Sequence, residues 1–339
     1  MRFLFYISQN YSIDILRPLQ AVMQEEGHEV CWFIEGEAVN RSALDAGETL
    51  LPSVKAVIAF NPDATYLPGN VVPAFIPGLK VQVFHGFEWK KKGHFRIRDC
   101  FDLYCTQGPF FTEKFLHLRA QHPHFTVAET GWPKLDPLFT SPPADTPSEM
   151  PEILYAPTFS PSLTSADALL DTIQTLSRSM PWKWTIKFHP KMDPAVVARY
   201  QAAENDKLSV SGAPSILPLL QRCDVMVSDT SSAITEFLLQ QKPVVTFNNA
   251  QPEPVLINIT QPAQLQDAVA QALADDDVKK QNIAEYARQM HPYTDGQSSQ
   301  RVLAATLDEL AHFPRPENRA KPRNWLRNLK LRKRLSYWK

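Results

Sequence analysis

The sequence is poor in glycine and cysteine and contains no long apolar run. Only 11 of the 339 residues are glycine and four are cysteine, and neither a GxGxxG fingerprint nor a CxxC pair occurs. A dinucleotide cofactor is therefore not indicated, and the cysteine spacing argues against a thiolate zinc site. No run reaches the ~20 apolar residues that a membrane-spanning helix needs. We expect reduced, buried cysteines in a cytoplasmic protein whose first residues form a strand rather than a signal peptide.

Charge is distributed unevenly along the chain. The net charge is −1, but residues 313–339 hold ten Lys/Arg against one acid, while the other residues carry 25 basic against 35 acidic side chains. A basic tail on an acidic body indicates an anionic partner, either a membrane surface or a nucleic acid. Trp325, Leu326 and Trp338 stand among the tail cations and favour an anionic membrane, although a helical wheel gives two apolar patches rather than one face. A solvated tail without a partner is the alternative.

Strand-like and helix-like segments alternate along the chain. Apolar runs at 2–7, 29–34, 55–60, 81–84 and 101–105 are typical of strands, and the spacing at 12–26 and 109–118 predicts helices. This alternation predicts parallel sheets with helices on both faces. A stretch with four prolines, 140–151, interrupts the pattern, which restarts at 152. We therefore predict an N-terminal domain (1–140), a linker (141–151), a C-terminal domain (152–312) and a basic tail (313–339), with a cleft between two α/β halves.

The stretch from Cys223 to Phe237 combines a strand, a polar turn and a helix. Val225–Val227 is apolar and β-branched at both ends, 228–232 holds hydroxyl side chains, and a helix begins near Ser232. Hydroxyls beside free backbone N–H groups at a helix start bind anions, phosphate above all. Glu236, one turn further, can reach a sugar or glycerol hydroxyl. The alternative is a plain connection in which Asp229 or Ser231 caps the helix.

Two histidines follow predicted strands. His85 and Gly86 come directly after 81–84, and His189 follows 184–188. A histidine at the carboxyl end of a strand projects into a cleft, and a neutral imidazole accepts a proton from a hydroxyl nucleophile. The lysines at 90–92 would hold phosphate. The alternative for His85 is a basic surface loop with a capping or core histidine. At the end of the first strand, residues 8–10 occupy the place where open α/β sheets bind ligands.

Several short stretches, taken together and in order, resemble one family. Each is weak alone, but they span residues 84 to 301. The chain is similar to the CDP-glycerol glycerophosphotransferases, which prime and polymerise teichoic acid. The matching stretches are Phe84-His85-Gly86 with Lys91-Lys92-Gly93, Gly131 to Asp136, Ile153 to Thr158, Lys187-Phe188-His189-Pro190, Cys223 to Glu236, and Asp295 to Ser299 with Arg301.

The resemblance implies a GT-B-like fold: two Rossmann-type domains whose parallel sheets face each other across a cleft, with the donor bound mainly by the second. It implies that an acceptor hydroxyl attacks the β-phosphorus of a CDP-linked alditol and releases CMP. It makes His85 the general base and His189 the contact of the donor diphosphate. The sequence indicates no cofactor and no carboxylate cluster that marks a metal site, but a diphosphate donor could bring Mg²⁺ with it. The substrate-binding residues that the resemblance implies are Gly86, Thr158, Lys187, Ser231, Ser232, Glu236, Asp295 and Ser298.

Departures from the family leave the donor open. The family has Tyr at Thr230, Asp at Glu236, and Thr-Pro at Phe87-Glu88. A GT-B glycosyltransferase that uses a nucleotide sugar is therefore the alternative function. The chain lacks the long N-terminal region of the polymerising members, which favours a single addition. We expect a glycan or lipid-linked acceptor and a peripheral position on the inner face of the cell membrane. Nucleic-acid binding through the tail is the least favoured hypothesis, because the acidic body opposes it.

Overall fold

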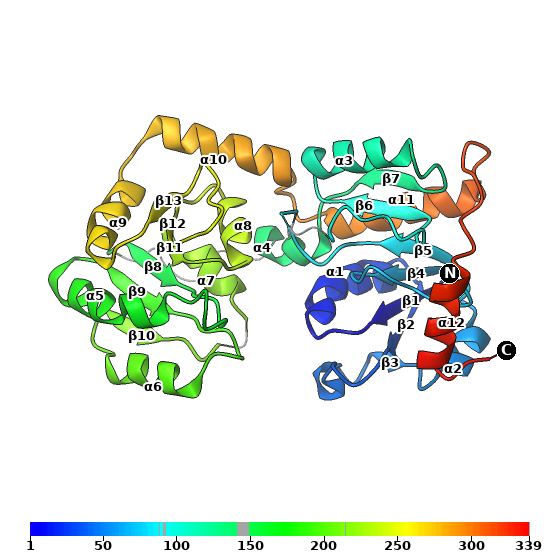
Figure 1. Ribbon diagram of the computed structural model, residues 1–339, viewed down its shortest axis with the longest axis horizontal. Coiled ribbons are helices and arrows are strands. Elements are labelled where there is room, and N and C mark those ends of the chain that lie inside the picture. Colours follow the sequence, from blue (N-terminus) through cyan, green and yellow to red (C-terminus); the bar gives the residue numbers. More distant parts are fainter. Residues whose placement is uncertain (88, 91–92, 141–148, 214, 339) are drawn as a thin grey trace. The chain divides into compact units, whose positions relative to one another are not determined.

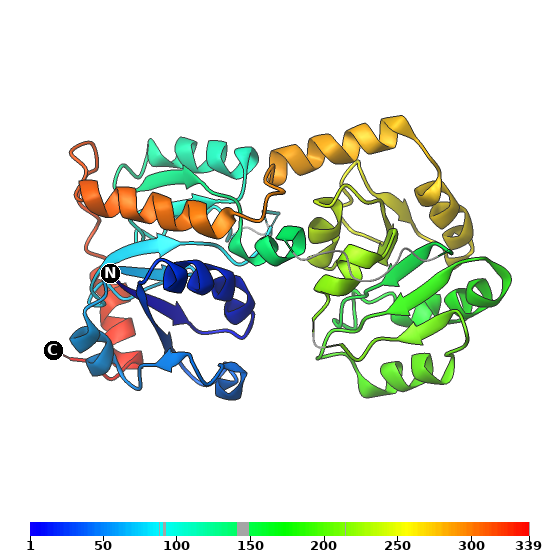
Figure 2. The ribbon, with the colours of Figure 1, turned by 180° about the vertical axis from the view of Figure 1, so that it is seen from behind.

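The protein is described by a computed structural model covering residues 1–87, 89–90, 93–140, 149–213 and 215–338. It divides into two compact units: unit 1 is Met1–Thr140 with Gln289–Lys339, and unit 2 is Ser141–Arg288 (Figures 1 and 2). Glu88, Lys91, Lys92 and most of the predicted linker lie outside the described residues.

Unit 1 contains a seven-stranded sheet in which every described strand pair is parallel. The strand order is β3-β2-β1-β4-β5-β6-β7. The chain therefore builds outward from β1 in one direction and then, from β4, in the other. Ligands bind outside the carboxyl ends of the strands at such a reversal. The strands are β1 (Arg2–Ile7), β2 (Glu29–Ile34), β3 (Thr49–Leu50), β4 (Ala64–Leu67), β5 (Leu79–Gln82), β6 (Leu103–Thr106) and β7 (Thr126–Glu129).

Helices from both ends of the chain accompany this sheet. The segment 55–60, predicted as a strand, is helical instead. Ser53 accepts a hydrogen bond from the Ala56 N–H (3.2 Å), and Val54 and Val57 form the buried face. Apolar residues three apart suit a helix that is buried on one side. The elements are α1 (Tyr11–Glu25), η1 (Arg41–Ala43), α2 (Val54–Phe60), α3 (Pro109–Arg119), η2 (Pro133–Leu135), α4 (Asp136–Thr140), α11 (Ser298–His312) and α12 (Trp325–Arg334).

Unit 2 repeats the same topology with six parallel strands. The order is β10-β9-β8-β11-β12-β13, so the reversal lies between β8 and β11. Its strands are β8 (Glu152–Tyr155), β9 (Lys183–Ile186), β10 (Leu208–Val210), β11 (Val225–Ser228), β12 (Val244–Phe247) and β13 (Ile257–Ile259). Its helices are α5 (Ala166–Ser179), α6 (Pro194–Ala202), α7 (Leu217–Arg222), α8 (Ala233–Leu238), η3 (Pro262–Gln264), α9 (Leu265–Leu273) and α10 (Asp277–Met290), the last ending in unit 1.

The predicted C-terminal domain boundary at 312 is wrong. Residues 289–312 belong to unit 1, where α11 packs against α1 and β6. The buried Asp136 carboxylate accepts hydrogen bonds from the N–H groups of Ser298 (2.8 Å) and Ser299 (2.7 Å) at the first turn of α11. The chain therefore returns to the first sheet before it ends, and the basic tail is also part of unit 1.

The four cysteines form no disulfide. Cys31, Cys105 and Cys223 are buried and Cys100 is partly exposed. Burial raises the pKa of Cys31 to about 11 and that of Cys223 to about 12, so their thiols stay protonated. Within the described part of the chain, no helix is both long enough and apolar enough to cross a membrane.

We predict that Asp136→Ala lowers the free energy of unfolding by about 2–4 kcal/mol, because two backbone N–H groups lose a charged acceptor. The matched control is Asp295→Ala, which removes a carboxylate that is 42% exposed and paired with Arg301. An exposed pair contributes about 0–1 kcal/mol, so the control should melt close to wild type. Thermal unfolding measures both variants, and equal destabilisation would contradict the assigned role of Asp136.

Candidate functional site

The backbone bends sharply after β5, just before His85. Phe84 is buried and has a positive φ of 58°, and Gly86 has φ 153°. A bulky residue in the left-handed region costs about 1–3 kcal/mol and persists only where its surroundings hold it, often at functional sites. The Trp132 indole N–H donates to the Phe84 carbonyl (3.3 Å), and the Gln107 amide donates to the Gly86 carbonyl (3.0 Å). These contacts fix the backbone on both sides of His85.

The His85 side chain lies close to the strand reversal of unit 1. Its Nδ1 is 3.3 Å from the carbonyl oxygen of Pro68, which follows β4, and its ring centroid is 5.7 Å from that of Tyr11, the first residue of α1. An Nδ1–H that donates to this carbonyl places the imidazole lone pair on Nε2. The geometry therefore suits a base that takes a proton at Nε2.

A cavity of about 370 Å³ opens at the same edge of the sheet. It is lined by residues that follow β1 and β4, among them Ser8 and Gln9, in the place predicted for ligands. Glu35, after β2, and Arg334, from the far end of α12, also line it and form an ion pair. No local pattern in the sequence indicates Arg334, because its position depends on how α12 packs.

In unit 2, a buried carboxylate closes the strand reversal. Asp229 is fully buried and accepts hydrogen bonds from the Thr158 N–H (2.9 Å) and from the N–H and hydroxyl of Ser165 (2.9 Å each). It therefore fastens the loop after β8 to the end of β11. One alternative drawn from the sequence was that Asp229 caps α8, and this is wrong, because α8 has no side-chain cap. Ser231 is closer to that role, since its Oγ accepts from the Ala233 N–H (3.3 Å).

His189 presents an N–H donor after β9. The Lys191 backbone N–H donates to its Nδ1 (3.1 Å), and its ring stacks on Phe159 with centroids 4.4 Å apart. An accepting Nδ1 leaves the proton of the neutral ring on Nε2. Partial burial, and then the charge of Lys191, lower the pKa of His189 below its usual 6.5, so the neutral form dominates at pH 7. The side chain is exposed and can donate from Nε2 to an anion.

The other predicted residues of unit 2 gather along one edge. Lys187, Thr158 and Ser231 follow β9, β8 and β11, which are neighbours in the sheet. The Lys187 ammonium donates to the Ala213 carbonyl. Ser232 is exposed, whereas Glu236 is only 3% exposed.

Asn249 is a residue of this edge that the sequence analysis missed. It follows β12, and its amide donates to the Asp229 carbonyl (2.9 Å). The sequence signal that could have indicated Asn249 is its position after the apolar run 244–247, which forms the strand next to β11.

Asp295 and Ser298, two of the predicted substrate-binding residues, belong to unit 1. Asp295 pairs with Arg301, and the buried Ser298 donates its N–H to Asp136. The same region holds His291, whose Nε2 accepts the Trp132 N–H (3.0 Å). These contacts connect two of the family-like stretches, Gly131 to Asp136 and Asp295 to Ser299.

One group of side chains in the described part of the chain has a geometry that can hold a metal ion. It consists of Asp99, His122 and His124, with one ligand atom of each within 4.8 Å of the others. The sequence analysis expected no metal site. Asp99 precedes β6 and the two histidines precede β7, at the amino ends of these strands, whereas His85 follows a carboxyl end, so the group is not part of the site described above.

We predict that His291 makes unit 1 sensitive to acid. Burial lowers the pKa of His291 to about 4, against about 6.5 in the unfolded chain, so its contribution is complete above pH 6.5 and is lost as the pH falls toward 4. At about 1.4 kcal/mol per pKa unit, the loss is roughly 2–4 kcal/mol.

Denaturant unfolding of wild type and His291→Gln at several pH values measures this loss. The stability difference between the two should shrink as the pH falls from 6.5 to 4. A difference that does not change with pH would contradict the prediction.

The family model that matches the chain is CDP-Glycerol:Poly(glycerophosphate) glycerophosphotransferase, over residues 90–307. No curated protein matches the sequence.

Several solved structures share the fold. A putative UDP-N-acetylglucosamine 2-epimerase from Listeria monocytogenes superposes with a TM-score of 0.68 at 16% identity, over 94% of this chain and 99% of that one. The wall teichoic acid polymerase TagF, in a variant soaked with CDPG, gives 0.63 at 14% identity over 92% and 89%. S. aureus MnaA with UDP gives 0.66 at 13% identity over 92% and 96%. The predicted GT-B-like fold with two Rossmann-type sheets is therefore confirmed.

Proposed function

The chain belongs to the CDP-glycerol:poly(glycerophosphate) glycerophosphotransferase family, and from that premise we propose its reaction. It transfers glycerol phosphate, or a related polyol phosphate, from a CDP-linked donor to a hydroxyl of a glycan or lipid-linked acceptor. CMP is released, and the product is a teichoic-acid-like surface polysaccharide. The observation that carries the proposal is the His85 imidazole, held on a strained bend at the ligand-binding edge of unit 1.

His85 acts as the general base. Its Nε2 takes the proton of the acceptor hydroxyl while the hydroxyl oxygen forms a bond to the β-phosphorus of the donor. The bond from that phosphorus to the bridging oxygen breaks, and CMP leaves with the oxygen and its electron pair. A positioned base contributes about 10²–10⁴ to the rate of such a step.

The donor is bound by the edge residues of unit 2. His189 donates from Nε2 to the diphosphate, where negative charge grows as CMP leaves. Thr158, Ser231, Ser232 and Lys187 complete the phosphate contacts, and Glu236 accepts from polyol hydroxyls. Support for a CDP-glycerol donor comes from the family and from the CDPG soak of TagF. Gly86 directly follows the base, and the family resemblance adds Asp295 and Ser298 of unit 1 as further substrate-binding residues.

A nucleotide-sugar glycosyltransferase is the second candidate. Two observations favour it: the fold is shared with UDP-N-acetylglucosamine 2-epimerase and with a UDP-bound MnaA, and Thr230 and Glu236 depart from the family.

We predict that CMP and one CDP-alditol raise the melting temperature, whereas UDP- and GDP-sugars do not. A ligand at 100 times its dissociation constant adds about 2.7 kcal/mol to the free energy of unfolding, which a melting curve detects. Thermal shift with CDP-glycerol, CDP-ribitol, CMP and the nucleotide sugars makes the comparison. Stabilisation by a nucleotide sugar alone would favour the second candidate.

We predict that His85→Ala lowers kcat by about 10²–10⁴ with little change in donor affinity, because a base is lost and the donor contacts remain. CMP release measures turnover, and thermal shift with the CDP-alditol measures binding. The matched control is His117→Ala, an exposed histidine on α3, which should keep full activity. Normal turnover of the His85 variant would refute the proposed base.

We also propose that the tail docks the enzyme on the inner face of the cell membrane, where a lipid-linked acceptor would lie. On α12, Trp325 is 67% exposed and Leu326 is 78% exposed, and Trp338 after it is 66% exposed, all within the basic segment. Exposed aromatic and leucine side chains among cations suit the interface of an anionic bilayer.

We predict that Trp325→Ala with Leu326→Ala weakens binding to anionic vesicles by at least about tenfold, since two apolar side chains no longer enter the interface. Vesicle co-sedimentation measures the affinity. Leu116→Ala, a 51% exposed leucine on α3, serves as the control and should bind like wild type. Unchanged binding of the double variant would contradict docking through α12.

A further inference from the structure

A second cavity, of about 460 Å³, opens where the tail crosses the amino ends of β5 and β6. Tail residues 321–332 form one side, and residues between β4 and β5, with Asp99 and Cys100 before β6, form the other. We call it the tail pocket. The Asn328 amide oxygen accepts the Ala74 N–H (3.2 Å) and holds α12 beside it.

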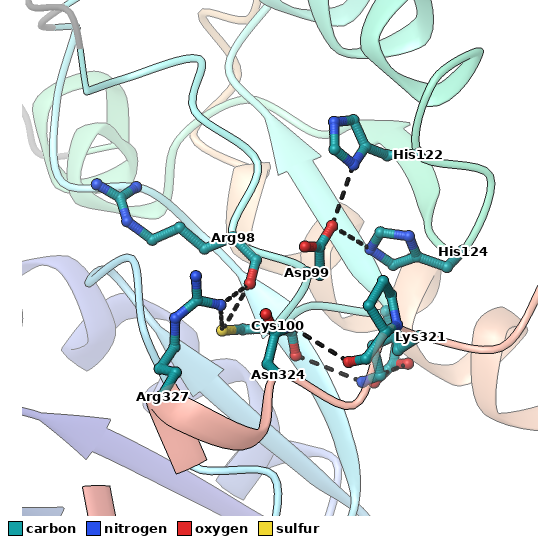
Figure 3. Close-up of polar contacts among 10 residues, drawn as sticks. Arg98, Asp99, Cys100, His122, His124, Lys321, Asn324 and Arg327 are labelled. Atoms are coloured by element: carbon teal, nitrogen blue, oxygen red, sulfur yellow. Dashed lines mark hydrogen bonds and ion pairs between the residues drawn. The ribbon is translucent and has the colours of Figure 1, made fainter. Parts of the chain in front are cut away.

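The lining of the tail pocket is strongly cationic. It includes Asp99 as its one acid, which already interacts with two histidines: His122 Nδ1 is 3.0 Å and His124 Nε2 is 3.5 Å from its carboxylate (Figure 3). Positive charge therefore exceeds negative charge around the cavity. The cations of the lining are Lys80, Lys321, Arg323, Arg327 and Arg332.

Most of these cations are held by neutral groups. The Lys80 ammonium donates to the carbonyls of Pro77 (3.2 Å) and Gly78, Arg327 donates to the Arg98 carbonyl (Figure 3), and Arg323 lies over the Trp325 ring at 5.7 Å. Among the residues that the structure describes, none of these three forms an ion pair with a carboxylate. Carbonyls and rings orient a cation but do not neutralise its charge.

Lys321, unlike these three cations, forms an ion pair: its ammonium lies 2.8 Å from the Asp102 carboxylate. It still adds repulsion at the buried Lys80. Burial first, then the charge of Lys321, lower the pKa of Lys80 to about 7. The five cations of the lining outnumber the lining carboxylate of Asp99, and a bound anion stabilises such an excess of like charge.

The shape and rim of the tail pocket indicate which anion it takes. Guanidinium forks and side-chain amides match the several oxygens of a phosphate. The mouth is apolar: Trp325 and Leu329, 67% and 51% exposed, line the cavity, and Leu326 is their exposed neighbour on α12. A small soluble anion would leave these side chains in water, whereas a phospholipid in a bilayer would cover them while its phosphate enters the pocket.

We propose that the tail pocket binds the phosphate headgroup of a single anionic phospholipid, an inference that rests on the membrane docking proposed above. Docking then depends on recognition of the phosphate group and not only on attraction to a negatively charged surface. The last turn of α12 carries Arg334 to the cavity near His85, so the helix that holds the lipid also forms part of the acceptor-side site.

The test uses the full-length enzyme and two kinds of phosphatidylcholine vesicle with equal zeta potential, one containing phosphatidylglycerol and the other oleate. We expect at least about tenfold tighter binding to the phosphatidylglycerol vesicles, since each bidentate arginine–phosphate contact is a strong charged hydrogen bond. Equal affinity of wild type for both vesicles would overturn the proposal.

Matched variants separate the pocket from the net charge. Arg323→Gln with Arg327→Gln removes two cations of the lining and should abolish the preference for phosphate. Lys330→Gln with Lys333→Gln removes the same charge from exposed positions of α12 outside the lining, and should weaken binding to both vesicles equally while keeping the preference. Because Arg327 also holds the Arg98 carbonyl, Arg323→Glu alone is a second variant that leaves this contact intact. A preference that survives in both pocket variants would overturn the proposal.

The remaining outcomes distinguish the possible failures. Binding of glycerol phosphate or inorganic phosphate by calorimetry, undiminished by phosphatidylglycerol vesicles, would identify a soluble anion as the occupant and overturn the lipid assignment. Vesicle binding without a preference for phosphate would overturn only the pocket. Failure to bind any anionic vesicle would overturn both the pocket and the proposed docking, while the transferase reaction would still be tested separately by CMP release.

Discussion

The hydrogen bonds of the buried Asp136 carboxylate hold the region that supports the candidate base, His85. The carboxylate holds the first turn of α11 through the N–H groups of Ser298 and Ser299, and so draws the end of the chain back to the first sheet. In this region His291 accepts the Trp132 N–H, and Trp132 in turn donates to the Phe84 carbonyl beside His85. A buried carboxylate is tolerated only when it is well hydrogen-bonded, and here its partners link residue 136 to the start of α11.

In unit 2, Asp229 is likewise a buried carboxylate that accepts backbone N–H groups. A loop that crosses the strand reversal exposes backbone N–H groups, and Asp229 accepts two of them together with the Ser165 hydroxyl. The acid is fully buried, and its hydrogen bonds order the loop. His189 is fixed differently, by stacking on Phe159 and by the Lys191 N–H. Each unit thus positions one histidine at the carboxyl ends of its strands, as an acceptor in unit 1 and as a donor in unit 2.

The tail gives unit 1 a second cavity, to which we assign the proposed docking. Its helix α12 packs beside residues 72–80 and joins two cavities, a cationic one near the amino ends of the strands and one near His85. Because Arg327 is oriented by a carbonyl and Arg323 by an aromatic ring, their charge remains available to an anionic partner. The proposed membrane docking and the proposed transfer reaction are therefore connected through one helix.

Local sequence patterns were enough to predict the fold class and the family of this protein. Alternating apolar runs predicted parallel α/β sheets, because a buried strand needs a run of apolar residues. Six short stretches predicted the family, because residues that suit phosphate binding lie within a few positions of one another in each stretch. Segment 55–60 was assigned wrongly, since a short apolar run fits a strand or a one-sided helix equally well.

Tertiary structure alone decided the return of residues 289–339 to unit 1 and the contact of Arg334 with Glu35. It also decided that Asp229 fastens a loop rather than caps a helix. These features depend on contacts between residues 60 to 300 positions apart, and such contacts are set by how whole elements pack and not by their local sequence.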